Sequence, residues 1–198
     1  SQFGIPKYSF PAPGFPASDT AGDLKQFQGY DCEAAKSLLA EAGYPDGAGF
    51  PAQELKLRGE TEARAAWWVA SAASISECLN VEITVNNMEF SAFMEGLLAR
   101  PTSVQFGAVS YGMDYLDPSN MLGVWVSTGR HSWRNETFDQ LVNDANVLVG
   151  DPAVRTQMYM DAEKILVEDV GGIFLVHRIQ GDLFQPYVAG DCFRPDAQ

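Results

Sequence analysis

The sequence predicts an α/β domain whose central sheet is mixed but mostly parallel and is flanked by helices. Strand-like and helix-like segments alternate between residues 55 and 109, an order typical of helices packed on a parallel sheet. The chain has 198 residues, of which 46% are hydrophobic, so it can bury a substantial core. We therefore expect a single domain with a sheet of about five strands.

The first 29 residues contain four prolines and four glycines, and we expect them to run extended across the surface without forming a helix or strand. A helix follows, because Asp31 is a good N-cap and apolar residues recur after it at helical spacing. Gly43 is the expected C-cap of this helix, and a turn is predicted over residues 44–47.

The middle of the chain is predicted to form three strands separated by two helices. The strict alternation of apolar and polar residues from Val81 to Val85 is the clearest strand signal, and Thr61 is the expected cap of the longer helix. The predicted elements are, in order, a strand at 55–57, a helix at 61–79, a strand at 81–85, a helix at 90–99 and a strand at 104–109.

Three more helices and a last strand complete the prediction. Pro118 begins a short helix, and Asp151 followed by Pro152 is a typical N-cap and first helical residue. The apolar run 173–176 predicts a buried strand, with a further extended piece through Leu183. The expected helices span residues 118–126, 137–149 and 152–170.

The charge of the chain argues against two classes of partner. Lysine and arginine number 13 and aspartate and glutamate 26, which gives a formal net charge of −13. Nucleic-acid-binding proteins need a basic face, and anionic membrane surfaces attract basic segments, so we expect neither partner. Acidity instead favours, weakly, cationic or amine-bearing ligands. There is also no run of 18 apolar residues that would predict a membrane-spanning helix.

The cysteines and histidines predict neither a disulfide framework nor a metal site. Cys32, Cys78 and Cys192 are too few and too scattered for a framework. One disulfide with one free thiol is compatible with them, but we favour three small buried apolar residues. His131 and His177 lie far apart in sequence, and no metal, nucleotide or nucleophile motif occurs. We expect no metal, no cofactor and no catalytic activity.

The segment after the third predicted strand is the main candidate for a binding site. Ligands of α/β proteins gather at the carboxyl ends of strands, and this end is followed by Tyr111, Asp114, Tyr115 and Asp117. Tyrosine rings can sandwich a ligand, and an aspartate in a partly dry cleft can pair with an ammonium group. Because Asp117 can instead cap the helix begun by Pro118, Asp114 is the strongest candidate.

Four segments resemble the family 5 extracellular solute-binding proteins, which are the dipeptide- and oligopeptide-binding receptors of ABC importers. Residues 30–47, YDCEAAKSLLAEAGYPDG, are similar to the family run YDPEKAKALLAEAGYPDG. Residues 113–118 resemble its ADYLDP segment, and residues 133–139 resemble its Y-x-N-P-E-F-D pattern. Residues 155–169 are similar to its R-x-x-x-Y-x-x-A-x-x-I-L-x-E-D helix. All four segments occur in the order of the family.

The resemblance implies that the chain is one lobe of a periplasmic-binding-protein-like receptor, whose two lobes close around a ligand by hinge motion. Family members are much longer, and their large N-terminal lobe has no counterpart in this sequence. By the resemblance, residues 1–29 are an extended crossing segment near the hinge and residues 30–185 are the ligand-binding lobe. Residues 186–198 are then a tail that leads back toward the missing lobe.

The resemblance also implies roles for individual residues and partners. Asp114 is expected to pair with the amino terminus of a peptide or of a similar amine-bearing small solute. For the carboxylate end the candidate is Arg58, which follows the first predicted strand, with Arg64 as second choice. The other expected partners are the permease subunits of an ABC transporter, in a periplasmic or extracellular location, with a lipid anchor as an option. The remaining predicted ligand-binding residues are Tyr111, Tyr115 and Asp117.

Two further interpretations stay open. A small α/β hydrolase-like enzyme could use Asp114 and Asp117 as an acid/base pair, although no nucleophile or cofactor motif accompanies them. The second open interpretation is that the chain is a protein-interaction module. The binding interpretation predicts that Asp114 is exposed on the face that meets the missing lobe. It also predicts that this lobe alone binds ligand poorly, because it offers only half of a cleft.

Overall fold

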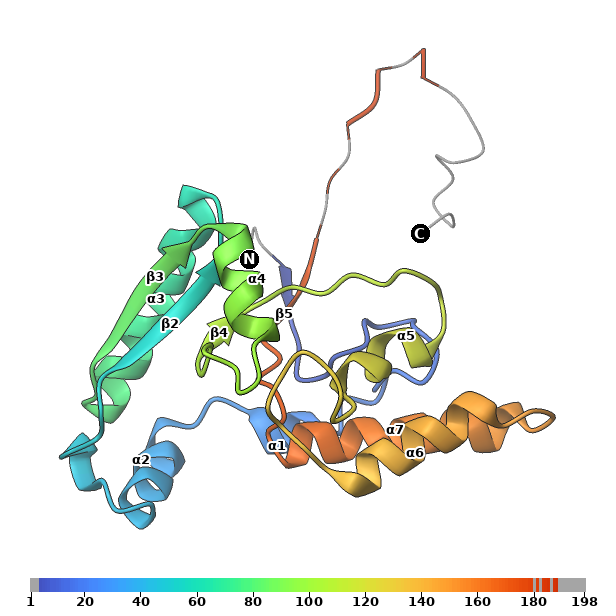
Figure 1. Ribbon diagram of the computed structural model, residues 1–198, viewed down its shortest axis with the longest axis horizontal. Helices are drawn as coiled ribbons and strands as arrows, with labels where there is room; N and C mark the ends of the chain where they lie inside the picture. The colour runs from blue at the N-terminus through green and yellow to red at the C-terminus, as the bar shows by residue number, and fades with distance from the viewer. Residues whose placement is uncertain (1–3, 180, 182, 186, 189–198) are drawn as a thin grey trace.

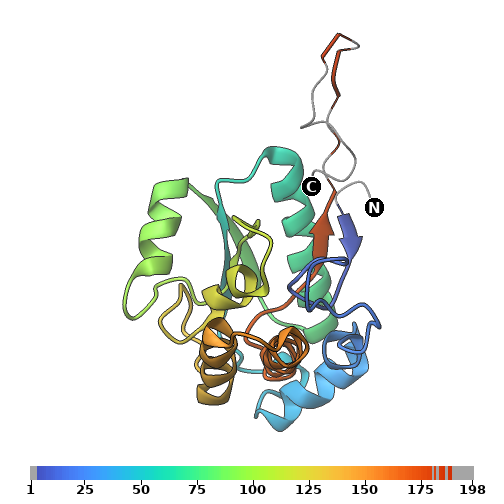
Figure 2. The ribbon, with the colours of Figure 1, turned by 90° about the vertical axis from the view of Figure 1, so that its right-hand side faces the viewer.

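The computed structural model describes residues 4–179, 181, 183–185 and 187–188, and it has the predicted α/β fold. The central sheet has three parallel strands in the order β3-β2-β4. Helices α3 and α4 cover opposite faces of this sheet (Figure 1, Figure 2). The bounds of these elements are β2 (Gln53–Arg58), α3 (Glu62–Leu79), β3 (Ile83–Met88), α4 (Phe90–Leu98) and β4 (Gly107–Ala108).

A second layer, made only of helices, lies beside the sheet, and its two long helices run alongside each other (Figure 1). Its helices are α5 (Pro118–Leu122), α6 (Glu136–Val147) and α7 (Pro152–Glu168), and a 3-10 turn at Gly123–Trp125 extends α5. One core cluster fills this layer, and a second fills the space between the sheet and α3. Among the fully buried side chains are Leu57 of the sheet and Phe138, Tyr159 and Leu166 of the helical layer.

The two ends of the described chain meet in a short antiparallel ladder. Strand β1 (Gly4–Pro6) pairs with β5 (Val176–Arg178), so that Gly4 lies opposite Arg178. Figure 2 shows this ladder at one end of the molecule, away from α6 and α7. Between β1 and the helix α1 (Lys25–Gln28), the N-terminal segment crosses the helical layer.

The predicted caps explain where several helices begin and end. The Asp31 side chain accepts the Ala34 backbone N–H at 2.9 Å at the start of α2 (Cys32–Glu41). Gly43 follows that helix with φ of +97°, a left-handed conformation in which glycine avoids the strain of a side chain. Asp151 caps α7 as expected. Thr61 occupies the N-cap position of α3, but its side chain makes no capping hydrogen bond.

The prediction of about five strands in one sheet was wrong. The third strand, predicted at 104–109, is reduced to two residues, and the strand predicted at 173–176 does not join the central sheet. Ile173 is 64% exposed, and pairing begins only at Val176, with β1 as partner. The first 29 residues also contain two elements, β1 and α1. Strand β1 forms because β5 supplies its backbone partners, which the local sequence could not reveal.

The preferred interpretation of the cysteines was also wrong, because Cys32 and Cys78 form a disulfide. Cys32 begins α2 and Cys78 lies in the last turn of α3, and their Cα atoms are 5.9 Å apart, a normal spacing for a disulfide. The contact depends on how α2 folds back against α3, which the sequence spacing does not specify. Cys192 lies outside the described residues. Within the described part of the chain, no helix is long and apolar enough to span a membrane.

Candidate functional site

Asp114 lies on an exposed loop between β4 and α5, and two neighbours fix its carboxylate. The Tyr111 hydroxyl donates to Oδ2 of Asp114 at 3.3 Å, and Nδ2 of Asn120 donates to the same oxygen at 3.3 Å. In return, the Asp114 backbone N–H donates to Oδ1 of Asn120 at 2.9 Å. Asn120 is buried in α5, so its hydrogen bonds with Asp114 hold the loop against that helix. The predicted exposure of Asp114 is confirmed, and among the described residues no cation forms an ion pair with it.

Tyr111 connects this carboxylate to the N-terminal crossing segment. Its ring stacks on Phe10, with centroids 6.0 Å apart and planes 29° from parallel. Partial burial, together with the neighbouring Asp114 charge, raises the pKa of the Tyr111 hydroxyl, which therefore stays protonated and donates to Asp114. The predicted pair of Tyr111 and Asp114 is thus brought together by the structure.

The loop around Asp114 also exposes apolar side chains. Tyr115 is 55% exposed, and its hydroxyl lies 3.2 Å from the Ser119 hydroxyl. Met113 and Leu116 on either side are exposed too. A cluster of exposed apolar side chains around an oriented carboxylate is the pattern expected where a second surface or a ligand packs.

Asp117 has a different environment from Asp114, because its two oxygens are used within the protein. It caps α5 by accepting the Ser119 backbone N–H at 2.9 Å, as its place before Pro118 predicted. The Arg155 guanidinium donates to both Asp117 oxygens, at 2.9 and 2.8 Å. These hydrogen bonds from Arg155, only partly offset by burial, lower the pKa of Asp117 to about 2. Asp117 therefore joins the site loop to α7, and its predicted contact with the ligand stays a prediction that these internal hydrogen bonds do not favour.

Arg58 lies at the carboxyl end of β2, where the sequence placed it. Its Nη2 donates to the Ser110 hydroxyl at 3.2 Å, and its guanidinium lies 5.5 Å from the centroid of the Phe90 ring. Arg178, which the sequence did not single out, donates to the same hydroxyl at 3.4 Å. The second-choice residue Arg64, on α3, instead pairs at 3.5 Å with Glu60, which precedes that helix. The only sequence signal for Arg178 was its position at the end of an apolar strand-like run.

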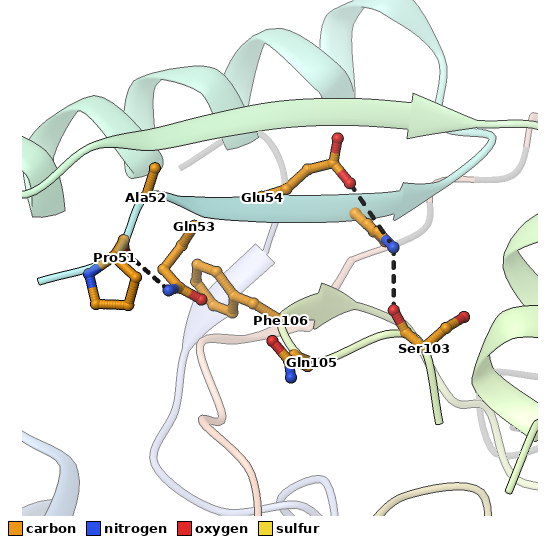
Figure 3. A pocket seen from close by; sticks show the side chains of 8 residues that line it. Pro51, Ala52, Gln53, Glu54, Ser103, Gln105 and Phe106 are labelled. Carbon is orange, nitrogen blue, oxygen red and sulfur yellow. Dashed lines mark hydrogen bonds and ion pairs between the residues drawn. The ribbon is translucent and has the colours of Figure 1, made fainter. Parts of the chain in front are cut away.

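A surface hollow of about 320 Å³ lies at the opposite, amino end of β2 (Figure 3). Its polar groups bond to one another: the Lys56 ammonium contacts the carbonyl of Ser103 at 3.0 Å and the Glu54 carboxylate at 3.7 Å. The Gln53 amide donates to the Pro51 carbonyl. Because these groups are already paired and the hollow lies away from the Asp114 loop, it is not the candidate site.

No group of three or more histidine, cysteine or carboxylate side chains within the described chain is placed to hold a metal ion. His131 packs against Trp125 with ring centroids 5.0 Å apart, and burial lowers its pKa. Burial likewise lowers the pKa of His177. The expectation that the chain uses neither metal nor cofactor stays a prediction.

Comparison with known proteins identifies the family. A model of the bacterial extracellular solute-binding proteins, family 5 Middle, matches residues 1–133, more than half of the chain. The chain therefore belongs to this family, as the resemblance of its four segments predicted.

Individual relatives agree with this assignment. The periplasmic oligopeptide-binding protein OppA of Salmonella typhimurium is 25% identical over 161 residues, 80% of this chain and 29% of that protein. The probable deoxycholate-binding periplasmic protein YgiS of Escherichia coli is 24% identical over 180 residues, 89% of this chain and 32% of that protein. The chain thus spans about a third of the length of these curated relatives.

The fold also matches a solved structure of the same kind. The crystal structure of the periplasmic oligopeptide-binding protein OppAIV from Borrelia burgdorferi aligns with a TM-score of 0.76 and 22% identity. The alignment covers 88% of this chain and 35% of that chain. The similarity confirms the periplasmic-binding-protein fold that the sequence predicted.

Proposed function

We propose that the chain is one ligand-binding lobe of the substrate-binding component of an ABC-type importer, and that it binds peptides or similar amine-bearing small solutes through Asp114. The observation that carries the proposal is the state of Asp114: exposed, oriented by Tyr111 and Asn120, and without a cationic partner among the described residues. An oriented carboxylate in this state can accept charge-assisted hydrogen bonds from an ammonium group.

The geometry suggests how binding and lobe closure are linked. On this lobe alone Asp114 faces water, where an ion pair contributes little. When a second lobe closes over the site, water is excluded and the pair between Asp114 and the ligand amine strengthens. The exposed side chains of Met113, Tyr115 and Leu116 would be covered in the same step. Arg58 is the proposed contact for the carboxylate end of the ligand.

The proposal includes the organisation and partners implied by the family. Residues 1–29 form the crossing segment near the hinge, residues 30–185 form the lobe, and residues 186–198 lead back toward the first lobe. The OppA relative is named for oligopeptide binding in the periplasm, and this supports a periplasmic or extracellular location and a partnership with permease subunits. A lipid anchor at a preceding N-terminus belongs to the same proposal.

The alternative of a hydrolase-like enzyme receives no support from the two aspartates. With its pKa at about 2, Asp117 stays ionised at neutral pH and cannot donate a proton as a general acid. Both of its oxygens also accept hydrogen bonds from Arg155, so it is not available as a general base. The environments of the two aspartates therefore favour a ligand-binding role for Asp114 and a structural role for Asp117.

The test is calorimetry on the natural gene product that contains this sequence, with alanine di-, tri- and tetrapeptides whose amino termini are free or acetylated. We expect binding of free peptides, loss of binding on acetylation, and a loss of ~2–5 kcal/mol in the Asp114→Asn variant. The matched control is Asp161→Asn, which changes another exposed aspartate that accepts one side-chain hydrogen bond. Equal binding of acetylated peptides, or an unchanged affinity in Asp114→Asn, would contradict the proposal.

A further inference from the structure

The N-terminal crossing segment supports the side chain that orients Asp114. The Phe10 ring stacks on the Tyr111 ring with centroids 6.0 Å apart, and the Tyr111 hydroxyl donates to Oδ2 of Asp114 at 3.3 Å. Among the ring contacts of the described residues, Phe10 is the aromatic partner of Tyr111. A residue near the start of the chain is thus connected to the proposed amine-binding carboxylate through a single side chain.

The hydrogen bond from Tyr111 to Asp114 depends closely on where the Tyr111 ring lies. The most common distance between two hydrogen-bonded oxygen atoms is about 2.7–2.8 Å, so at 3.3 Å this bond is already long. Gly112 follows Tyr111 in the exposed loop, and apart from its chain neighbours no atom of the described chain lies within 4 Å of the position that a Cβ atom would take there. The loop is not packed at this point, so the stacking on Phe10 is the contact that we expect to hold the ring in place.

Phe10 is itself held from two sides. Its ring packs against Trp125 and Phe174, whose ring centroids are 5.5 and 5.4 Å away. Its backbone N–H donates to Oε1 of Glu163 on α7 at 3.0 Å. The aromatic contacts orient the ring, and the bond to Glu163 holds the backbone of the crossing segment on a long helix. Phe10 therefore presents its ring to Tyr111 from a fixed position.

The Glu163 side chain makes one hydrogen bond within the described part of the chain, the one from Phe10, and no cation pairs with it there. Glu163 is 1% exposed, and burial of a carboxyl group without a charged partner costs free energy. An apolar side chain of similar size would serve packing alone better. The buried carboxyl group is explained if its task is to fix Phe10, since proteins keep such local costs where a functional site requires them.

We propose that Glu163 and Phe10 are positioning residues for Asp114 and act on it through Tyr111. Glu163 fixes the Phe10 backbone, and the Phe10 ring fixes the Tyr111 ring. The Tyr111 hydroxyl then orients the carboxylate that binds the ligand amine. The inference rests on the proposed function and adds regulation of the same site from α7. A displacement of either positioning residue lowers the affinity for amine-bearing solutes, because the carboxylate is no longer preorganised.

The charge of Glu163 is expected to control this arrangement. Burial raises the pKa of Glu163 to about 8, so the group is neutral at pH 7 and ionises in mildly alkaline solution. Glu163 also lines a hollow of about 150 Å³, and we expect the ionised carboxylate to turn toward water there and away from Phe10. The other charged groups that line this hollow are Asp19, Asp23, Asp161 and Lys164. Ionisation should therefore release Phe10 and weaken ligand binding.

The experiment is a double-mutant cycle, measured by calorimetry with triglycine on the natural gene product that contains this sequence. Phe10→Leu should raise the Kd about fivefold, a typical coupling between side chains in contact. In the Tyr111→Phe background the same change should alter the Kd by less than about twofold, because the hydroxyl through which Phe10 acts is missing. The matched control is Phe50→Leu, at a ring that packs on a different tyrosine, Tyr44, and it should leave the Kd within about twofold. An equal effect of Phe10→Leu in both backgrounds would overturn the inference.

A pH series tests the part played by Glu163. Glutamine keeps an acceptor for the Phe10 N–H and cannot ionise, so Glu163→Gln should bind triglycine like the wild type at pH 6. Between pH 6 and pH 8.5 the ratio of the wild-type Kd to the Glu163→Gln Kd should rise roughly threefold. The ligand amine and the other charged groups titrate in both proteins, so their effect cancels in this ratio. A constant ratio, or weaker binding by Glu163→Gln at pH 6, would overturn the role of Glu163.

The carbon NMR signal of the Asp114 carboxyl group, measured in the ligand-free 198-residue chain, separates this inference from the proposed function. Tyr111→Phe should shift this signal, Phe10→Leu should shift it in the same direction, and Phe50→Leu should leave it unchanged. A shift in Phe10→Leu, together with wild-type binding of triglycine by Asp114→Asn, would support the positioning and contradict the proposed function. No shift in Phe10→Leu, together with lost binding by Asp114→Asn, would overturn the positioning alone.

Discussion

Asp114 and Asp117 are three residues apart in one loop, yet their neighbours give them different roles. Asp114 receives hydrogen bonds from a neutral hydroxyl and a neutral amide and faces solvent. Asp117 receives two bonds from the Arg155 guanidinium, which also donates to the Ala145 carbonyl and the Tyr159 hydroxyl. Asp114 is thereby left available to a ligand, while Asp117 holds the loop on the helical layer.

Asp117→Asn is predicted to destabilise the chain by ~1–2 kcal/mol at pH 7, because it removes the charged partner of Arg155. Asparagine is also a good N-cap, so the start of α5 should survive. The pKa of Asp117 is lowered from 3.8 to about 2 on folding, so its contribution is present above pH 4 and is lost as the pH falls toward 2.

Urea unfolding at a series of pH values measures this contribution as the difference between wild type and Asp117→Asn. The difference should shrink between pH 4 and pH 2. Asp144→Asn, at an exposed aspartate on α6, is the control and should unfold like the wild type at every pH. A difference that does not depend on pH would show that the Arg155 pair is not its source.

Helix α2 is joined to the rest of the fold by a disulfide and has no buried face. None of its residues is buried, although its capping is good at both ends. The disulfide from Cys32 to Cys78 connects its first turn to the last turn of α3. A short helix without a buried face gains little from packing, so the disulfide is the main restraint on its position.

Replacing both cysteines by alanine is predicted to lower the free energy of unfolding by ~2–4 kcal/mol, since it removes a cross-link between residues 46 apart. Hydrogen exchange should rise across residues 32–41 and stay unchanged in β2 and β3. As a control, a reducing agent should reproduce the effect in the wild type and do nothing further to the double variant. Unchanged exchange in α2 would mean that packing alone holds the helix.

At the scale of the whole molecule, the N-terminal crossing segment connects the β1–β5 ladder with the Asp114 loop. The Phe10 ring packs against Tyr111, Trp125 and Phe174, and its backbone N–H donates to Oε1 of Glu163 at 3.0 Å. Glu163 is 1% exposed, and this burial raises its pKa to about 8. The segment that supports the candidate site is therefore fastened to α7 by a carboxyl group that is neutral at pH 7.

Glu163→Gln is predicted to remove a pH dependence of stability. The pKa of Glu163 is about 4.5 in the unfolded chain and about 8 in the folded chain. In this window the folded state binds more protons, so stability is full below pH 4.5 and falls as the pH rises toward 8. Glutamine keeps an acceptor for Phe10 and cannot ionise. The wild type should therefore lose stability relative to Glu163→Gln as the pH rises, by up to roughly 4 kcal/mol.

Thermal or urea unfolding between pH 5 and pH 8 measures this difference. Glu168→Gln, at an exposed glutamate near the end of the same helix, should keep the wild-type profile. The hollow beside Glu163 is also lined by four other charged residues, Asp19, Asp23, Asp161 and Lys164. These residues are the same in the wild type and in Glu163→Gln, so their contribution to the pH dependence of stability cancels in the comparison. Parallel pH profiles for wild type and Glu163→Gln would refute the prediction.

Features that depend on near neighbours in the chain could be predicted from the sequence. The helix caps at Asp31 and Asp151, the exposed loop with Asp114, and the cap role of Asp117 all involve partners within a few residues. Capping, turn chemistry and hydrophobic periodicity act over such short distances, so each leaves a local pattern. The four segments that identify the family are of the same local kind.

Contacts between residues far apart in the chain became known from the three-dimensional fold. The disulfide joins residues 46 apart, the Asp117–Arg155 pair joins residues 38 apart, and the hydrogen bond from Arg178 to Ser110 spans 68 positions. The pairing of β5 with β1, in place of the central sheet, is likewise a long-range contact. Such contacts follow from the topology that buries the most apolar surface, and no local pattern records them. For this reason the sequence identified Asp114, whereas Arg178 emerged only from the fold.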